Sequence, residues 1–195
     1  NAAAGYRAGI PVEFVSQRID AGQPSLWQTL SWAADAKYGQ PLASVDTALV
    51  GLWRFEETVA PVTNAVGAND GTVTGAKFEA VGRFGKCLTF DGSADFVSIP
   101  HSASFEPARG SIEAWAYFEG TLNRVVVNKG ASGTGYTLGT DAVGYPYFEV
   151  ADVRCTSASP LRARKWVHMV GTIDGAKMRL WVDGRCVAAG AFVGS

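Results

Sequence analysis

The sequence lacks a surplus of charge of either sign. Lysine and arginine together number 17, aspartate and glutamate together number 18, and the formal net charge of the 195-residue chain is -1. Proteins that bind nucleic acid or anionic membranes usually carry a basic patch or stripe. The composition therefore predicts a protein with no electrostatic affinity for nucleic acid or for a membrane surface.

Long apolar runs and metal-binding spacings are also missing. No apolar stretch approaches the roughly 20 residues that a membrane-spanning helix needs, so we expect no membrane span. The chain has three cysteines, at positions 87, 155 and 186, and two histidines, at positions 101 and 168. None of them follows a C-x-x-C pattern, which argues against a zinc or redox motif.

Glycine, by contrast, is abundant. The 23 glycines and eight prolines separate short runs of Val, Thr, Phe, Tyr and Trp, which is typical of an all-β protein. A hydrophobic fraction of 47% is enough for a core in a chain of this size. We predict few helices, an N-terminal β arm and linker over residues 1–47, and one large β domain over residues 48–195.

The clearest structural signal is a hairpin between Lys165 and Arg185. Its first strand, Trp166 to Ile173, is rich in β-branched and aromatic residues and ends at Asp174-Gly175, a pair that tolerates the positive φ of a tight turn. Along Met178 to Val182, apolar residues alternate with other residues, which indicates a strand half buried in a sheet. Further strands are expected at 48–57, on both sides of a turn within 88–100, and at 112–118, 124–129, 136–139, 145–155 and 186–192.

These segments resemble, in their order, the laminin-G-like or concanavalin-A-like jelly-roll superfamily found in bacterial surface proteins. The motif WVHMVGTIDG followed by MRLWVDG carries the resemblance most clearly. The upstream matches, in family order, are ALVGLWRFEE, GANDGTV, GRFGKCLTFDGSADFVSIP, GSIEAWAYFE and VVNKGASGTGYTLG. The resemblance implies an antiparallel two-sheet jelly-roll sandwich in an extracellular or cell-surface protein.

The resemblance also implies an incomplete sheet, because members of the family continue with one or two further strands beyond the position of Ser195. A sheet without them would expose unpaired backbone groups and apolar surface until another strand filled the slot. The N-terminal arm is a candidate filler, and exchange between identical subunits would build a fibre unless it closes. The apolar residues of this arm are Val12, Phe14, Ile19, Trp27, Leu30 and Trp32.

A saccharide site needs aromatic faces beside polar side chains. The residues that offer them are Tyr145, Tyr147, Trp166, His168, Arg179 and Trp181. The alternative for the aromatic members is packing in the core of the sandwich, which is the usual place for aromatic residues in this architecture.

Calcium is a second candidate ligand, because the superfamily often holds one Ca²⁺ near its loop rim and loop oxygens are hard ligands. The candidate ligands are Asn69, Asp70, Asp91 and Asp95. The alternative is that these side chains satisfy the backbone of their own turns. Thr63 and Asn64 occupy the place where relatives often have an aspartate that begins this loop.

Catalysis and a disulfide are the remaining possibilities. Glycoside hydrolases need a pair of carboxylates about 5 to 10 Å apart, and no strand here carries a cluster of alternating acids, so we expect a protein that is not an enzyme. Cys155 and Cys186 both lie at predicted strand ends and are candidates for a disulfide, with free thiols as the alternative.

Two functions follow from these features. The first is a non-catalytic, extracellular structural or adhesive subunit that assembles with copies of itself by strand exchange. The second is a carbohydrate-binding module, with or without calcium, of a larger surface protein or glycoside hydrolase.

Overall fold

The computed structural model describes residues 48–106, 109–130 and 135–192. The chain divides into two compact units, Asn1–Ala48 and Leu49–Ser195, and nearly all the described residues belong to the second unit. The predicted assembly arm, which contains Val12, Phe14, Ile19, Trp27, Leu30 and Trp32, lies outside the described residues.

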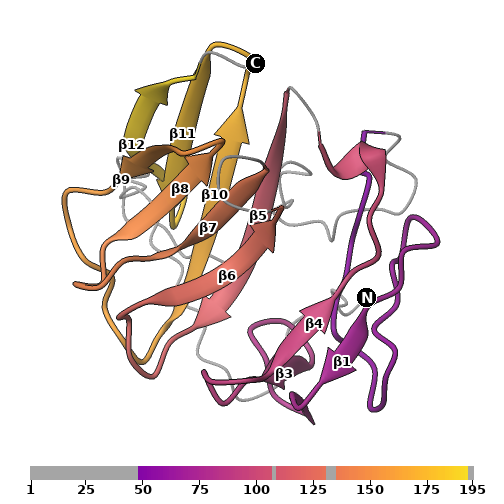
Figure 1. The fold of residues 1–195 in the computed structure, drawn as a ribbon. Helices are drawn as coiled ribbons and strands as arrows, with labels where there is room; N and C mark the ends of the chain where they lie inside the picture. The colour runs from indigo at the N-terminus through magenta and orange to yellow at the C-terminus, as the bar shows by residue number, and fades with distance from the viewer. Residues whose placement is uncertain (1–47, 107–108, 131–134, 193–195) are drawn as a thin grey trace, which may run out of the picture. The chain divides into compact units, whose positions relative to one another are not determined.

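Two four-stranded antiparallel sheets form the body of the second unit. The first sheet has the order β12-β11-β10-β5 and consists of β5 (Gly110–Tyr117), β10 (Trp166–Ile173), β11 (Lys177–Val182) and β12 (Arg185–Ala191). The second has the order β6-β7-β8-β9 and consists of β6 (Arg124–Lys129), β7 (Tyr136–Thr140), β8 (Pro146–Val150) and β9 (Val153–Thr156). The two sheets lie face to face (Figure 1), which confirms the predicted antiparallel jelly-roll sandwich.

The hydrophobic core lies between these two sheets. Along β10, buried and half-buried residues alternate without interruption, because successive side chains of a strand point to opposite faces. The largest side chains with no exposed surface come from both sheets: Leu138, Phe148, Met169, Met178 and Leu180. The predicted half-buried strand pattern is thus confirmed in β10 and in β11.

Gly171 of β10 marks a close approach between the sheets. A Cβ atom at this position would lie 2.4 Å from Cδ2 of Phe148 on β8. The ring of Phe148, which has no exposed surface, therefore occupies the space that a side chain at position 171 would need.

Two short ladders precede the sandwich in the chain. β1 (Thr72–Thr74) pairs with β4 (Phe96–Ser98), and β2 (Lys77–Glu79) pairs with β3 (Cys87–Thr89). A 3-10 turn, η1, spans Ala103–Phe105. None of the helical structure in the described residues is long and apolar enough to cross a bilayer.

The predicted hairpin of β10 and β11 forms, and its turn is held by the carboxylate of Asp174. This carboxylate accepts hydrogen bonds from the backbone N–H groups of Ala176 (3.2 Å) and Lys177 (2.8 Å), and it pairs with Nη1 of Arg179 at 2.8 Å. The Arg179 hydrogen bond, followed by those two backbone groups, lowers the pKa of Asp174 from 3.8 to about 2. The Asp-Gly signal therefore identified both the turn and the residue that stabilises it.

The structure corrects two of the expected strands and shows how another two are paired. Residues 48–57 form no strand, since Phe55 has a φ of 56° and only Trp53 makes an isolated bridge. Residues 145–155 form two strands, because Ala151 and Asp152 adopt φ values of 45° and 63° and turn the chain between β8 and β9. The strands within 88–100 exist but do not pair with each other, because β3 pairs with β2 and β4 with β1.

Each of the two four-stranded sheets in the described part of the chain has two edge strands with one partner each, β5 and β12 in the first sheet and β6 and β9 in the second. β5 pairs only with β10, and β6 pairs only with β7. β5 and β6 contact each other across the same side of the sandwich, so the unpaired edges of these two strands are adjacent. Apolar side chains of both strands that face the core, Ile112, Ala116, Val126 and Val127, are only partly buried there.

We expect the Gly171→Ala substitution to lower the free energy of unfolding by about 1 to 3 kcal/mol, because the added methyl group overpacks the core against Phe148. Gly120→Ala is the matched control, since a Cβ at position 120 would meet nothing within 4 Å. That control should stay within about 0.5 kcal/mol of the unsubstituted protein. Urea denaturation measures both values, and equal stabilities of the two variants would contradict the close packing described for Gly171.

Candidate functional site

The outer face of the first sheet carries a row of aromatic side chains. Because paired residues of an antiparallel ladder point to the same side, the pairs Trp166 with Tyr117 and His168 with Trp115 face outward together. Trp181 of β11 has the same orientation, since its neighbours along the strand point into the core. We call the surface formed by these five residues the aromatic face.

The rings of the aromatic face are ordered in two pairs. The ring of Trp115 stacks on that of His168, with centroids 4.9 Å apart and an interplanar angle of 19°. The rings of Tyr117 and Trp166 meet edge to face at 5.8 Å and 63°. Trp115 and Tyr117 nevertheless remain 40% and 44% exposed. The pairing fixes the rings while leaving much of their surface open to a ligand.

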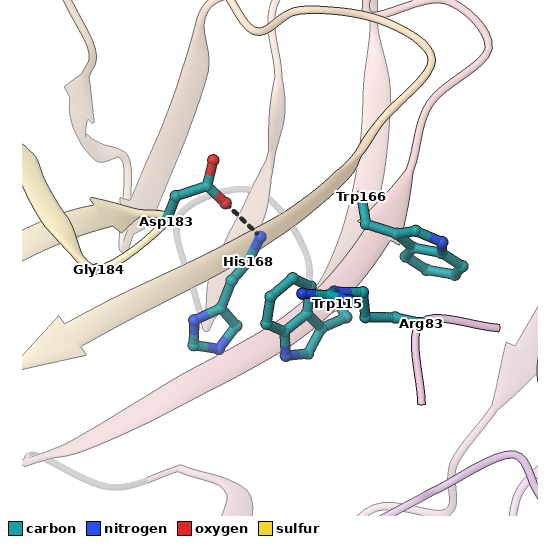
Figure 2. Close-up of a pocket in the computed structure, with 6 residues that line it drawn as sticks. All are labelled: Arg83, Trp115, Trp166, His168, Asp183 and Gly184. Carbon is teal, nitrogen blue, oxygen red and sulfur yellow. Dashed lines mark hydrogen bonds between the residues drawn. The ribbon is translucent and has the colours of Figure 1, made fainter. Parts of the chain in front are cut away.

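A pocket of about 590 Å³ opens on the aromatic face (Figure 2). Its walls come from β5, from β10, from the turn between β11 and β12, and from the loop between β2 and β3. The lining residues are Arg83, Trp115, Trp166, His168, Asp183 and Gly184.

Asp183 ties the β11–β12 turn to β10. Its Oδ1 accepts a hydrogen bond from the backbone N–H of His168 at 3.0 Å, shown as the dashed line in Figure 2, and its own N–H donates to the carbonyl of His168 at 2.9 Å. Its Oδ2 lies 3.2 Å from Nζ of Lys165. Asp183 has a φ of 48°, a left-handed conformation that aspartate and asparagine tolerate better than most residues. The turn is therefore held against the strand that carries His168.

Arg83 reaches the pocket from the loop between β2 and β3. Its guanidinium carbon lies 4.9 Å from the ring centroid of Phe84 and 4.9 Å from that of Trp115. The two rings themselves meet edge to face at 5.3 Å. These contacts attach the loop to the aromatic face and place a cation at the rim of the pocket.

The predicted saccharide residues divide into three groups. Trp166 and His168 line the pocket. Trp181 and Arg179 share the outer face of the sheet but do not line the pocket: the indole Nε1 of Trp181 donates to Oγ1 of Thr172 at 3.4 Å, and Arg179 pairs with Asp174.

Tyr145 and Tyr147 belong to the other sheet and are not part of the pocket. Tyr147 is only 7% exposed, the guanidinium of Arg154 lies 3.8 Å above its ring, and burial raises the pKa of its hydroxyl group. Tyr145 precedes β8 and donates its backbone N–H to Asp141. Tyr147 alternates with the core residue Phe148 along β8, so its ring lies on the outer face of that sheet under Arg154, away from the pocket.

Sequence reasoning missed Arg83, Trp115, Tyr117 and Asp183. For two of them a signal existed, since Trp115 and Tyr117 alternate with the core-facing residues of SIEAWAY and so share the outward face. Asp183 stands in an Asp-Gly pair, which is the pattern of a turn and gives no sign of a pocket. Nothing local distinguishes Arg83, because its place at the pocket depends on how a loop folds back on β5.

The four candidate calcium ligands lie in two separate places. Asn69 and Asp70 precede β1, whereas Asp91 and Asp95 precede β4, and these strands run antiparallel, so the two pairs lie at opposite ends of the ladder. Each group serves its own loop: Asp70 accepts from the backbone of Asn64, and Oδ1 of Asp91 accepts from the backbone of residues 93 to 95. No single ion can bind all four, and the described residues include no cluster of three or more His, Cys, Asp or Glu side chains suited to a metal.

The three cysteines are free thiols in this structure. Cys155 is buried on β9 and Cys186 is exposed on β12, and these two strands contact each other at one side of the sandwich. Burial is the main cause that raises the pKa of the Cys155 thiol, and the nearby Cys186 raises it further. Their pairing stays a prediction.

We expect Asp183→Ala to lower the free energy of unfolding by about 1 to 2 kcal/mol, because it removes the acceptor for His168 N–H and places alanine in a left-handed conformation. Asp183→Asn keeps the acceptor oxygen and the conformational tolerance, so it should lose less than half as much. Chemical denaturation compares the two variants. Equal losses of stability in the two variants would contradict the role of the hydrogen bond and of the turn conformation. They would assign the effect to the ion pair of Asp183 with Lys165.

One comparison with known proteins gives a match. The model of the family described as the concanavalin A-like lectin/glucanases superfamily matches residues 91–195, which include both sheets of the sandwich. No curated protein and no solved structure matches the chain significantly. Together with the two-sheet antiparallel fold, the family match shows that this chain belongs to the concanavalin A-like lectin/glucanases superfamily.

Proposed function

We propose that this protein is a non-catalytic, extracellular adhesive module that binds a saccharide in the pocket on its aromatic face. The observation that carries the proposal is the set of partly exposed, mutually ordered rings of Trp115, Trp166 and His168 around one opening. Sugar rings present apolar C–H faces that pack on aromatic rings, while their hydroxyl groups need polar partners beside them. The family's name includes lectins, which agrees with this use of the fold.

The polar groups around the pocket support binding without catalysis. Asp183 already accepts from His168 N–H and lies beside Lys165, so its carboxylate has structural partners. Glu113 lies 3.6 Å from Nε2 of His168 across the β5–β10 ladder. A hydrolase would need one carboxyl group to protonate the leaving oxygen and a second carboxylate to act as base or nucleophile. The engagement of Asp183 favours a role in shaping the pocket.

We expect Trp166→Ala to weaken saccharide binding by roughly 30-fold, since loss of an aromatic hot spot costs about 2 kcal/mol. Phe96→Ala is the matched control, because Phe96 is 52% exposed on β4 and lies outside the pocket. A glycan array identifies the ligands, and calorimetry with the best of them measures the affinities of all three proteins. If no glycan binds, or if the two variants lose affinity equally, the proposal is wrong.

A second candidate function is assembly by strand exchange, and the adjacent unpaired edges of β5 and β6 favour it. Such edges expose backbone donors and acceptors that an added strand can pair with. The core-facing side chains of the edge strands can then pack on the apolar residues of the added strand. The N-terminal segment of another copy, with the apolar residues Phe14, Ile19 and Trp27, supplies such a strand in this proposal. Repeated head-to-tail pairing would build a fibre unless it closes into a ring.

Sedimentation velocity over a concentration series tests this assembly. We expect the full chain to form larger species as its concentration rises, and the double variant Trp27→Lys, Leu30→Lys to remain monomeric because charge on the arm opposes its burial. Val143→Lys, at a loop position that is 64% exposed, is the control and should assemble normally. A full chain that stays monomeric at every concentration rules out strand exchange.

A further inference from the structure

Arg83 has no ion-pair partner among the residues that the structure describes. Each of the seven ion pairs in that part of the chain joins other residues, and the contacts of Arg83 are those with the rings of Phe84 and Trp115. A guanidinium that stacks on a ring keeps its N–H groups at the edge of its plane. Arg83 therefore presents hydrogen-bond donors at the pocket, and no acceptor in the described part of the chain is shown to occupy them.

The acidic groups near the pocket do have partners. Asp183 pairs with Lys165 at 3.2 Å, and Glu113 lies 3.6 Å from His168. Lys165 offsets the field of Asp183, so this carboxylate repels an approaching anion less than an unpaired one would. Glu113 is not among the described residues that line the pocket. Among the described residues that line the pocket, Arg83 is therefore the charged side chain that has no ion-pair partner in the described part of the chain.

We propose that the pocket selects acidic saccharides, and that Arg83 binds the carboxylate of a uronic-acid or sialic-acid residue while the sugar ring packs on Trp166. This inference rests on the proposed saccharide binding and adds the chemical class of the ligand. The planar fork of a guanidinium matches the two oxygens of a carboxylate, and such charge-assisted pairs are stronger than hydrogen bonds between neutral groups.

A carboxylate fits this pocket better than a heavily sulfated chain does. Polysulfated saccharides need several cations spread along a surface, as other polyanions do. The chain has a net charge of -1, and the lining that the described residues give the pocket contains one arginine, Arg83, and no lysine. A single unpaired cation matches a single negative charge on each bound sugar.

The test is an array of uronic-acid and sialic-acid oligosaccharides, each printed beside its carboxyl-reduced form, together with neutral and sulfated glycans. We expect binding to acidic glycans that carboxyl reduction abolishes. Calorimetry with the best acidic glycan should show that Arg83→Gln weakens binding by about 10- to 100-fold, and that Arg83→Lys has a smaller effect.

The control is Arg109→Gln, which removes the same charge from an exposed arginine just before the start of β5, about 20 Å along the strand from Trp115. Its affinity should equal that of the unsubstituted protein. The Arg83 variants should remain folded, with denaturation midpoints lowered only slightly by the lost contacts with Phe84 and Trp115. Equal binding of acidic and carboxyl-reduced glycans would overturn the role of Arg83 while leaving saccharide binding intact. Binding to sulfated glycans alone would overturn the carboxylate assignment, and no binding at all would overturn both proposals.

Discussion

The fit of the Phe148 ring against the backbone of Gly171 allows the two sheets to approach each other closely at the centre of the sandwich. This contact fixes which side of β10 faces the core, since Met169 and Ile173 must point inward with Gly171. A shift of one residue would exchange the two faces of the strand and bury the face that carries Trp166 and His168. The outward direction of Trp166 and His168 therefore follows from the packing of residues that never contact a ligand.

The aromatic face becomes a pocket only because segments from outside the ladder close around it. The β11–β12 turn reaches β10 through the hydrogen bonds of Asp183, and the loop after β2 reaches β5 through the stacking of Arg83 and Phe84 on Trp115. A flat sheet surface offers few directional contacts, whereas these two segments add charge and hydrogen-bonding groups beside the rings.

Much of the sandwich could be predicted because its strands carry local signals. The strand 166–173 matched the prediction at both ends, and the Asp174-Gly175 turn formed as expected. The segment 48–57 has a similar composition but forms no strand, because Phe55 adopts a left-handed conformation that no local pattern predicts. The turn at Ala151 and Asp152 was missed for the same reason, since neither residue is the glycine that usually marks positive φ.

The sequence by itself determined the all-β class and the positions of most strands, because alternation and turn residues act over a few neighbouring positions. It also offered Trp166 and His168, which line the pocket, as candidate site residues. Only the tertiary structure decided that Trp115, Tyr117 and Arg83 join them and that Tyr145 and Tyr147 do not. It also separated Asn69 and Asp70 from Asp91 and Asp95, which lie at opposite ends of one ladder. Strand pairing and loop placement depend on contacts between residues far apart in the chain, and a local pattern does not contain that information.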